Sequence, residues 1–396
     1  MKTLKQFSLL LFILALVASM QGQSVYFTDT VYSDNNPQSI YSILQYKIIK
    51  GDTIKEGPAK YFYPSGRLWQ NGFYKNDQFD SLWTSYYLTG QKKKESFYKN
   101  GKQNGAVVNY FENGNYQFTG IYINDSLNGE MTIYFPTGEI SETRFYKNNK
   151  LNGMLTGYFK NGNINYRMAY KDSIRDGLFE KYYESGVIKE KALMKGNSFY
   201  GSYVSYYENG QIESTYSYKG FDIDGAYLVF YENGNPMIQC DYVKGVPKGL
   251  WKQFYIDGAL FEEGQYQEGK RTGEWLSFYN DSTLYMQGKY VNGKASGLWK
   301  LYHKNDTIKQ IGSFSDGKSQ GLWKFYYDNG QLLKKGSFKD NKEDGHWVHY
   351  YENGKVKFDL YYSEGKLQGI LTAYDENGKI VEQAEYFDNV IVRRIK

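Results

Sequence analysis

The chain has 396 residues, and 48 lysines and arginines against 43 aspartates and glutamates give it a formal net charge of +5. So balanced a charge lacks the basic footprint of a nucleic-acid-binding protein, and the single cysteine, Cys240, excludes an intramolecular disulfide. The 43 tyrosines and 42 glycines, beside only 6 prolines, predict strands joined by tight turns.

The N-terminal segment has the pattern of a secretory signal peptide. Lys2 and Lys5 precede an apolar run at residues 7–18, which is too short to span a bilayer, and small and polar residues follow. We therefore predict a signal peptide over residues 1–22 and export to the periplasm, the cell envelope or the extracellular space. Residues 23–56 contain strand-like runs out of register with the rest of the chain, which predicts an irregular N-terminal cap.

Residues 57–392 consist of fourteen units of 24 residues, followed by a basic tail at 393–396. Each unit is numbered here from its first glycine, such as Gly249; only Ser81 breaks this series. A second glycine at position ten, such as Gly258, is replaced only by Ser282 and Asp306. Aromatic residues fill position six in every unit, and no stretch has helical periodicity. The period predicts an all-β fold, an elongated single-layer antiparallel β-hairpin meander in which each unit contacts its neighbours.

Turn chemistry predicts how each hairpin pairs. An Asn-Gly or Asp-Gly step at positions nine and ten favours a two-residue turn, and a second turn is expected at positions twenty and twenty-one. A two-residue turn places position three opposite position sixteen, so that Trp251 faces Gly264 and Gly249 faces Tyr266. We expect each tryptophan ring to cover the glycine opposite it within its own hairpin.

Alternation of side chains along a strand predicts two different faces. Positions three, seven, twelve, sixteen and eighteen should share a buried face of Trp, Tyr, Ile and Gly. Position six should project to the opposite, partly solvated face as a column of tyrosines among polar residues.

The repeat resembles the MORN repeat, and more closely its bacterial MORN-2 or YwqK-type variant. Two units carry the match, GLWKFYYDNGQLLKKGSFKDN and GHWVHYYENGKVKFDLYYSEG, and the pattern covers nearly all of residues 57–392. The resemblance implies a β-hairpin ribbon that acts as a scaffold, dimerises or lies near membranes, and YwqK-like proteins are named as antitoxins. It implies no catalytic residues.

The sequence has only weak matches to catalytic, nucleotide-binding or metal-binding motifs. Residues 312–319, GSFSDGKS, fit the P-loop pattern formally, but a strand and a turn are expected where a P-loop needs a helix, and the repeat itself generates near-copies. His346 and His349 should point to opposite faces of a strand, and His303 replaces a tyrosine, so no metal site or catalytic triad follows. We therefore expect no enzyme activity, no cofactor and no metal.

The sequence favours an exported, non-enzymatic scaffold that binds protein through an extended aromatic β-surface. A module that binds glycans or anionic lipid headgroups at the cell envelope remains open, as does an antitoxin-like inhibitor by family resemblance. A protein is the expected partner, glycan or membrane-surface contact and a homodimer remain open, and nucleic acid is not expected. The predicted binding residues lie in the C-terminal half of the position-six face: Tyr302, Tyr326, Tyr350, Lys300, Lys324 and Lys357.

Overall fold

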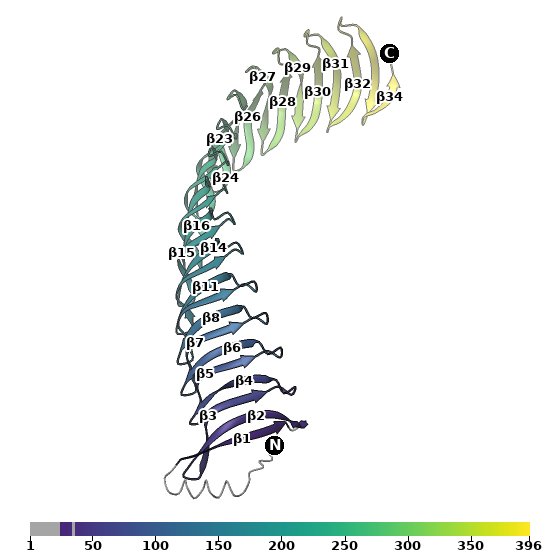
Figure 1. The fold of residues 1–396 in the computed structure, drawn as a ribbon. Helices are drawn as coiled ribbons and strands as arrows, with labels where there is room; N and C mark the ends of the chain where they lie inside the picture. The colour runs from purple at the N-terminus through teal and green to yellow at the C-terminus, as the bar shows by residue number, and fades with distance from the viewer. Residues whose placement is uncertain (1–23, 34–35) are drawn as a thin grey trace. The chain divides into compact units, whose positions relative to one another are not determined.

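A computed structural model describes residues 24–33 and 36–396, and these contain strands and turns but no helix. The predicted all-β fold is confirmed. The signal-peptide prediction falls on residues 1–22, which lie outside the described residues. All 34 strands belong to one open sheet, in which most strands pair antiparallel with the strand before and the strand after them in the sequence (Figure 1).

Contacts divide the chain into two compact units, Met1–Ser198 and Phe199–Lys396. The strands of the first unit are β1 (Val25–Ser33), β2 (Asn36–Ile49), β3 (Asp52–Phe62), β4 (Leu68–Lys75), β5 (Gln78–Tyr86), β6 (Lys92–Lys99), β7 (Lys102–Tyr110), β8 (Tyr116–Ile123), β9 (Ser126–Leu127), β10 (Gly129–Tyr134), β11 (Ile140–Lys147), β12 (Lys150–Leu151), β13 (Gly153–Tyr158), β14 (Ile164–Lys171), β15 (Ile174–Tyr182) and β16 (Ile188–Lys195).

The second unit contains β17 (Ser198–Tyr206), which begins one residue before it, β18 (Ile212–Lys219), β19 (Asp222–Ile223), β20 (Gly225–Phe230), β21 (Pro236–Val243), β22 (Val246–Phe254), β23 (Leu260–Gln267), β24 (Lys270–Phe278), β25 (Leu284–Val291), β26 (Lys294–Tyr302), β27 (Ile308–Ser315), β28 (Lys318–Tyr326), β29 (Leu332–Lys339), β30 (Lys342–Tyr350), β31 (Val356–Ser363), β32 (Lys366–Tyr374), β33 (Ile380–Phe387) and β34 (Val390–Arg394).

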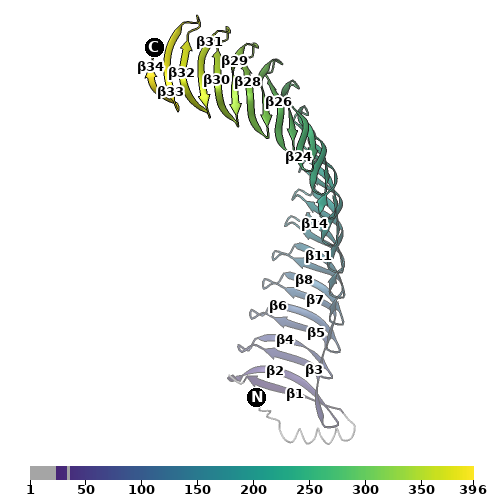
Figure 2. The same cartoon turned by 180° about the vertical axis from the view of Figure 1, so that it is seen from behind.

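Each 24-residue repeat forms one hairpin. The strand β2 precedes the repeats and pairs with β1 on one side and β3 on the other, so residues of the predicted cap continue the same sheet. Figure 2 shows the hairpins from behind, following one another in chain order within each unit. At three of the boundaries between repeats the strand that enters the next hairpin is interrupted and divides into a short and a longer piece, as in β9 and β10.

The turn around position ten is longer than predicted. In the hairpin of β22 and β23, the Gly258 N–H donates to the Tyr255 carbonyl at 3.0 Å, and the Tyr255 N–H donates to the Ala259 carbonyl at 2.8 Å. The loop therefore has three residues, of which only Gly258 has a positive φ, +93°. This is a type I turn followed by a left-handed glycine, and the prediction of a two-residue turn at this end is wrong.

The predicted register is nevertheless confirmed, because a bulge compensates for the longer loop. Phe254 pairs with Leu260 while Gln253 pairs with Glu262, so Phe261 is an extra residue in the second strand. All fourteen repeat hairpins have a register shift at this place. Beyond the bulge the pairs are those predicted, Trp251 with Gly264 and Gly249 with Tyr266.

The bulge also changes which residues share a face. Position twelve pairs with position six, and in one hairpin the rings of Tyr110 and Tyr116 at these positions lie 5.5 Å apart. The prediction that position twelve lies with the tryptophans is therefore wrong. We call the face with positions three, five, fourteen, sixteen and eighteen the tryptophan face, and the face with positions two, four, six, twelve, fifteen and seventeen the tyrosine face.

The tryptophan face of the second unit carries a continuous aromatic ladder. Each tryptophan from Trp275 to Trp347 packs edge-on against the position-eighteen ring of its own hairpin and that of the preceding one, with centroids 5.1–6.2 Å apart. These tryptophans are 0–4% exposed. The prediction that they form core is confirmed, and the ladder supplies the buried apolar area that a single-layer sheet otherwise lacks.

The glycine under each ring comes from the preceding hairpin. The prediction that each ring covers the glycine of its own hairpin is therefore wrong. A Cβ built on Gly264 would lie 2.1 Å from the Trp275 ring, and one on Gly288 would lie 2.1 Å from the Trp299 ring. For Trp251, the position of the preceding hairpin that elsewhere holds this glycine is occupied by Cys240, and Trp251 is only half-buried. Each ring therefore needs a bare backbone in the neighbouring repeat to reach full burial.

Candidate interaction surface

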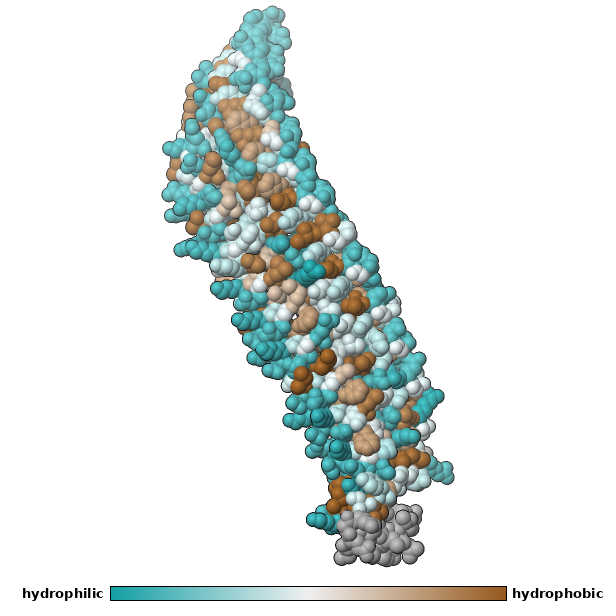
Figure 3. All heavy atoms as spheres, turned by 60° about the vertical axis from the view of Figure 1, so that its left-hand side comes forward, coloured by the Kyte–Doolittle hydropathy of each residue, from teal (hydrophilic) through white to brown (hydrophobic). Residues whose placement is uncertain are grey.

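The tyrosine face exposes large apolar side chains along its length. They occupy positions two and seventeen, which pair across each hairpin, and they are between 37% and 55% exposed. In the first unit they are Phe73, Leu82, Phe97, Ile121, Phe145 and Leu193, and in the second unit Leu250, Leu298, Leu322, Tyr361 and Ile370. Figure 3 shows hydrophobic side chains reaching the surface between hydrophilic ones on the side that it presents.

The two units build this apolar row from different strands. In the first unit most of its members stand at position seventeen, but in the second unit that position is mostly polar and position two carries the apolar side chain. Leu298 pairs with Ser313 in this way, and Leu322 pairs with Ser337. Our sequence reasoning followed position seventeen alone and missed the exposed leucines, although cross-strand pairing of positions two and seventeen could have found them.

The three predicted binding tyrosines end the strands β26, β28 and β30 of the second unit, and all three are half-buried. Their hairpins are consecutive, which places neighbouring members of the column about 9.6 Å apart, two strand spacings. The Tyr302 hydroxyl lies 3.4 Å from Gln287 Oε1. Position fifteen of one hairpin therefore meets position six of the next.

Two of the predicted lysines lie beside this column. Lys300 and Lys324 stand two residues before Tyr302 and Tyr326 in the same strands, so each lysine shares a face with its tyrosine. Lys324 pairs with Lys335 across its hairpin. These lysines give the face a positive charge between its tyrosine rings.

The remaining lysine lies elsewhere. The Lys357 Nζ is 5.2 Å from the ring centroid of Tyr351 and 5.6 Å from that of Phe358, which belongs to the tryptophan face. The bulge at position thirteen turns its side chain away from the tyrosine column. Its place is taken by Lys335, whose Nζ lies 5.8 Å from the Tyr350 ring and which the sequence reasoning missed.

A series of hydrogen bonds from side chains to backbone carbonyls joins consecutive hairpins beside the tyrosine column. The hydroxyl at position seven donates to the carbonyl at position six of the next hairpin, as Tyr279 does to Tyr302 and Tyr327 to Tyr350, both at 2.9 Å. His303 Nε2 takes the same place, 3.0 Å from the Tyr326 carbonyl. The histidine therefore substitutes for a tyrosine in a structural contact, which explains its place in the repeat.

The other titratable candidates are dispersed. His346 Nε2 lies 2.7 Å from Asp359 Oδ1, whereas His349 packs against Phe358 with its ring centroid 6.0 Å away, so the two histidines occupy different surroundings. Burial, and then Lys334 and Lys357, lower the pKa of His349. Cys240 is buried opposite Tyr227, and burial raises the pKa of its thiol to about 11, which leaves it protonated at neutral pH.

The described part of the chain offers few other candidate sites. Residues 24–33 and 36–396 hold no cluster of three or more metal-ligating side chains. The run at 312–319 lies on β27, a turn and β28, so it lacks the helix of a P-loop. Within these same residues, no helix is long and apolar enough to cross a membrane.

Comparison with known proteins identifies the repeat. Nine segments match the family described as MORN repeat variant, at residues 55–76, 80–100, 127–148, 175–195, 199–219, 223–244, 319–340, 343–364 and 367–389. No curated protein matches the chain.

Similar solved structures include the crystal structure of TcdB2-TccC3-Cdc42, with 10% identity over 92% of this chain and 26% of that one, at a TM-score of 0.15. A structure of the Photorhabdus luminescens Tc holotoxin pore shares 10% identity over 91% of this chain and 23% of that one, at a TM-score of 0.16. The chain thus spans about a quarter of the length of these structures. Scores this low carry no argument about function.

Proposed function

Because this chain is a MORN repeat protein, we propose that it acts as a non-enzymatic scaffold that binds another protein through its tyrosine face. One observation carries the proposal: large apolar side chains stay exposed at the paired positions two and seventeen of this face in most of the hairpins of both units. Monomeric soluble proteins rarely expose extended apolar surface, and where it occurs between polar residues it is typical of interaction sites.

The opposite face supports this choice by elimination. Its rings pack against each other and over glycines, so they offer a partner little surface that is not already buried. The tyrosine face, in contrast, combines exposed leucines, half-buried rings and lysines. Cores of protein interfaces are enriched in aromatic residues, with polar groups around them.

Within the second unit we place the docking region around Tyr302, Tyr326 and Tyr350. Leu298 and Leu322 lie in the first two of these strands on the same face, and they are 54% and 55% exposed. Lys300, Lys324 and Lys335 stand among them. An apolar protein segment flanked by carboxylates would complement this arrangement of rings, leucines and lysines.

Site-specific cross-linking tests the proposal. A photoreactive amino acid at Leu322 should form adducts with a partner in native cell fractions, because this side chain would lie inside the interface. Changing Tyr302, Tyr326 and Tyr350 together to Ser should reduce the adduct at least tenfold. The matched control is the same photoreactive group at Ile256, which is 63% exposed at a loop tip.

Two results would argue against this surface. Adducts that persist at full yield in the folded triple variant would remove the tyrosine column from the interface. Adducts that form equally well from Ile256 and Leu322 would indicate random encounters. Circular dichroism of the triple variant must match that of the parent protein, since position six also contributes to packing.

We further propose that the chain is exported and its first residues removed, because the basic residues and short apolar run at 1–22 have the pattern of a signal peptide. Mass spectrometry of the native protein should find an N-terminus near residue 20 and no Met1. Recovery of the full-length chain from the cytoplasm would contradict export and favour the antitoxin-like interpretation.

A further inference from the structure

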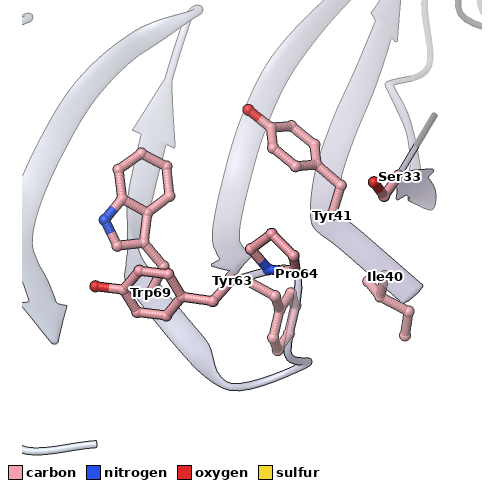
Figure 4. Close-up of a pocket in the computed structure, with 7 residues that line it drawn as sticks. Ser33, Ile40, Tyr41, Tyr63, Pro64 and Trp69 are labelled. Atoms are coloured by element: carbon pink, nitrogen blue, oxygen red, sulfur yellow. The ribbon is translucent and has the colours of Figure 1, made fainter. Parts of the chain in front are cut away.

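The first unit holds an aromatic pocket that is separate from the tyrosine-column docking region. Its volume is about 300 Å³, and it lies beside the loop that joins β3 to β4. Its lining includes Tyr41, Tyr63, Pro64 and Trp69, and no lining residue carries a charge. Figure 4 shows the rings of Tyr63 and Trp69 close together, with Tyr41 and Pro64 across from them.

Two exposed rings of this pocket occupy equivalent places in consecutive hairpins. Tyr32 pairs with Ile40 while Val31 pairs with Ser42, so Tyr41 is the bulge residue of β2. In the next hairpin the pairs Phe62–Leu68 and Tyr61–Gln70 leave Trp69 as the bulge residue of β4. Tyr41 is 49% exposed and Trp69 is 39% exposed, so both rings are open to a ligand.

The floor between these two rings is held in place. The Tyr63 hydroxyl donates to the Tyr86 carbonyl at 2.7 Å, and the Ser39 hydroxyl donates to the Pro64 carbonyl at 2.9 Å. The Tyr61 ring contacts both Tyr41 and Trp69, with centroids 6.2 Å apart in each case. A ligand would therefore meet a largely preformed site, which lowers the entropy cost of binding.

The chemistry of the lining defines the ligand. An uncharged aromatic pocket suits a neutral, rigid ligand with flat apolar faces. Tyr41 Oη and Trp69 Nε1 have no hydrogen-bond partner among the described residues, so two donors at the edges of the rings can meet carbonyl oxygens. Proline-rich segments combine these properties, because their rings are apolar and their backbone carbonyls point into solvent.

The spacing of the strands also matches the repeat distance of a proline-rich segment. One strand, β3, separates β2 from β4, so the bulge positions are about 9.6 Å apart. A polyproline II helix advances about 9.3 Å per turn of three residues. We propose that this pocket binds a proline-rich segment in the polyproline II conformation, with prolines three residues apart packed against Tyr41 and Trp69.

The chain itself provides a control for this geometry. Phe261 and Tyr285 occupy the same bulge position in two consecutive hairpins of the second unit. Their rings pack directly on Tyr255 and Tyr279, with centroids 5.1 Å apart in both cases. Aromatic residues at the bulge are thus present there too, but each packs edge-on against the tyrosine of its own hairpin, closer than Trp69 lies to Tyr63, with centroids 6.4 Å apart.

Titration calorimetry of the full chain tests the proposal, with a nine-residue peptide of three Pro-Pro-Ala repeats as the probe. We expect a dissociation constant of about 10–500 µM, weakened at least tenfold by Tyr41→Ala and by Trp69→Ala. Trp69→Phe keeps a ring but loses the N–H donor, so it should weaken binding less than Trp69→Ala. The double control Phe261→Ala with Tyr285→Ala should leave the dissociation constant within twofold.

Several outcomes would overturn the assignment. They are no binding at millimolar peptide, equal binding of a Gly-Ser-Ala peptide of the same length, and unchanged binding by the Tyr41→Ala variant. Displacement of the peptide by a neutral oligosaccharide would reassign the pocket to sugars. Because Tyr41 is half-exposed, its variant decides the question even if Trp69→Ala disturbs the fold. Cross-linking from Leu322 should not change in any of these variants, which separates this test from that of the proposed scaffold function.

Discussion

Gly288→Ala should destabilise the second unit by about 3 kcal/mol or more, although it adds one methyl group. The backbone at Gly288 is not in the left-handed region, so alanine could adopt its conformation without strain. The added Cβ, however, would lie 2.1 Å from the Trp299 ring, a contact that neither the ring nor the sheet can accept. The ring must leave its place over the backbone, and the cost combines overpacking with lost burial.

Gly120 provides a matched control because it occupies the same repeat position. The residue facing it from the next hairpin is Met131 and not a tryptophan, and the nearest atom to an added Cβ is the end of the Leu127 side chain at 3.3 Å. Gly120→Ala should therefore change stability by less than about 1 kcal/mol, and it can even stabilise through the unfolded chain.

Hydrogen exchange measured by mass spectrometry is the appropriate readout, because a repeat array can melt locally before it unfolds globally. In Gly288→Ala, protection should fall in β25 and β26 and their neighbours. Adding Trp299→Leu to Gly288→Ala should recover part of the protection. Similar losses of protection for Gly288→Ala and Gly120→Ala would contradict the placement of the ring over the glycine.

These glycines illustrate how far the sequence determines the fold. The 24-residue period and the turn residues were sufficient to predict the hairpins, their order and the pairing of Trp251 with Gly264. The same pairing led to a wrong packing prediction, because cross-strand alignment says which backbones are opposite and not toward which neighbour a ring leans. The ring leans over the preceding hairpin. This packing between hairpins cannot be derived from rules for strand pairing within one hairpin.

The turn around position ten shows a second limit of prediction from the sequence. A two-residue loop and a three-residue loop followed by a bulge give the same register beyond the bulge, so aligned residues cannot distinguish them. They differ in which face position twelve occupies and in where the bulge residue points. For that reason Lys357 was grouped with the tyrosine column, although its amine lies over Tyr351 and Phe358, and the pocket between the bulge residues Tyr41 and Trp69 could not be anticipated.

Trp299→Ala should cost about 3–5 kcal/mol, as expected for the loss of a fully buried large ring, whereas Tyr326→Phe should stay within about 0.5 kcal/mol. Trp299 is 4% exposed, and its ring contacts those of Tyr290 and Phe314 at 5.1 Å and 5.6 Å. Removing it leaves Gly288 uncovered and interrupts the ladder.

Tyr326 stands on the other face, and its hydroxyl has no hydrogen-bond partner among the described residues. Its structural contact is made by the backbone carbonyl, which faces His303 Nε2 and is unchanged in phenylalanine. Denaturation in urea followed by near-ultraviolet circular dichroism should therefore show an early transition for Trp299→Ala alone. Equal midpoints for the two variants would mean that the tryptophan ladder is not the stabilising side of the sheet, and the argument that the tyrosine face is free to bind a partner would lose its basis.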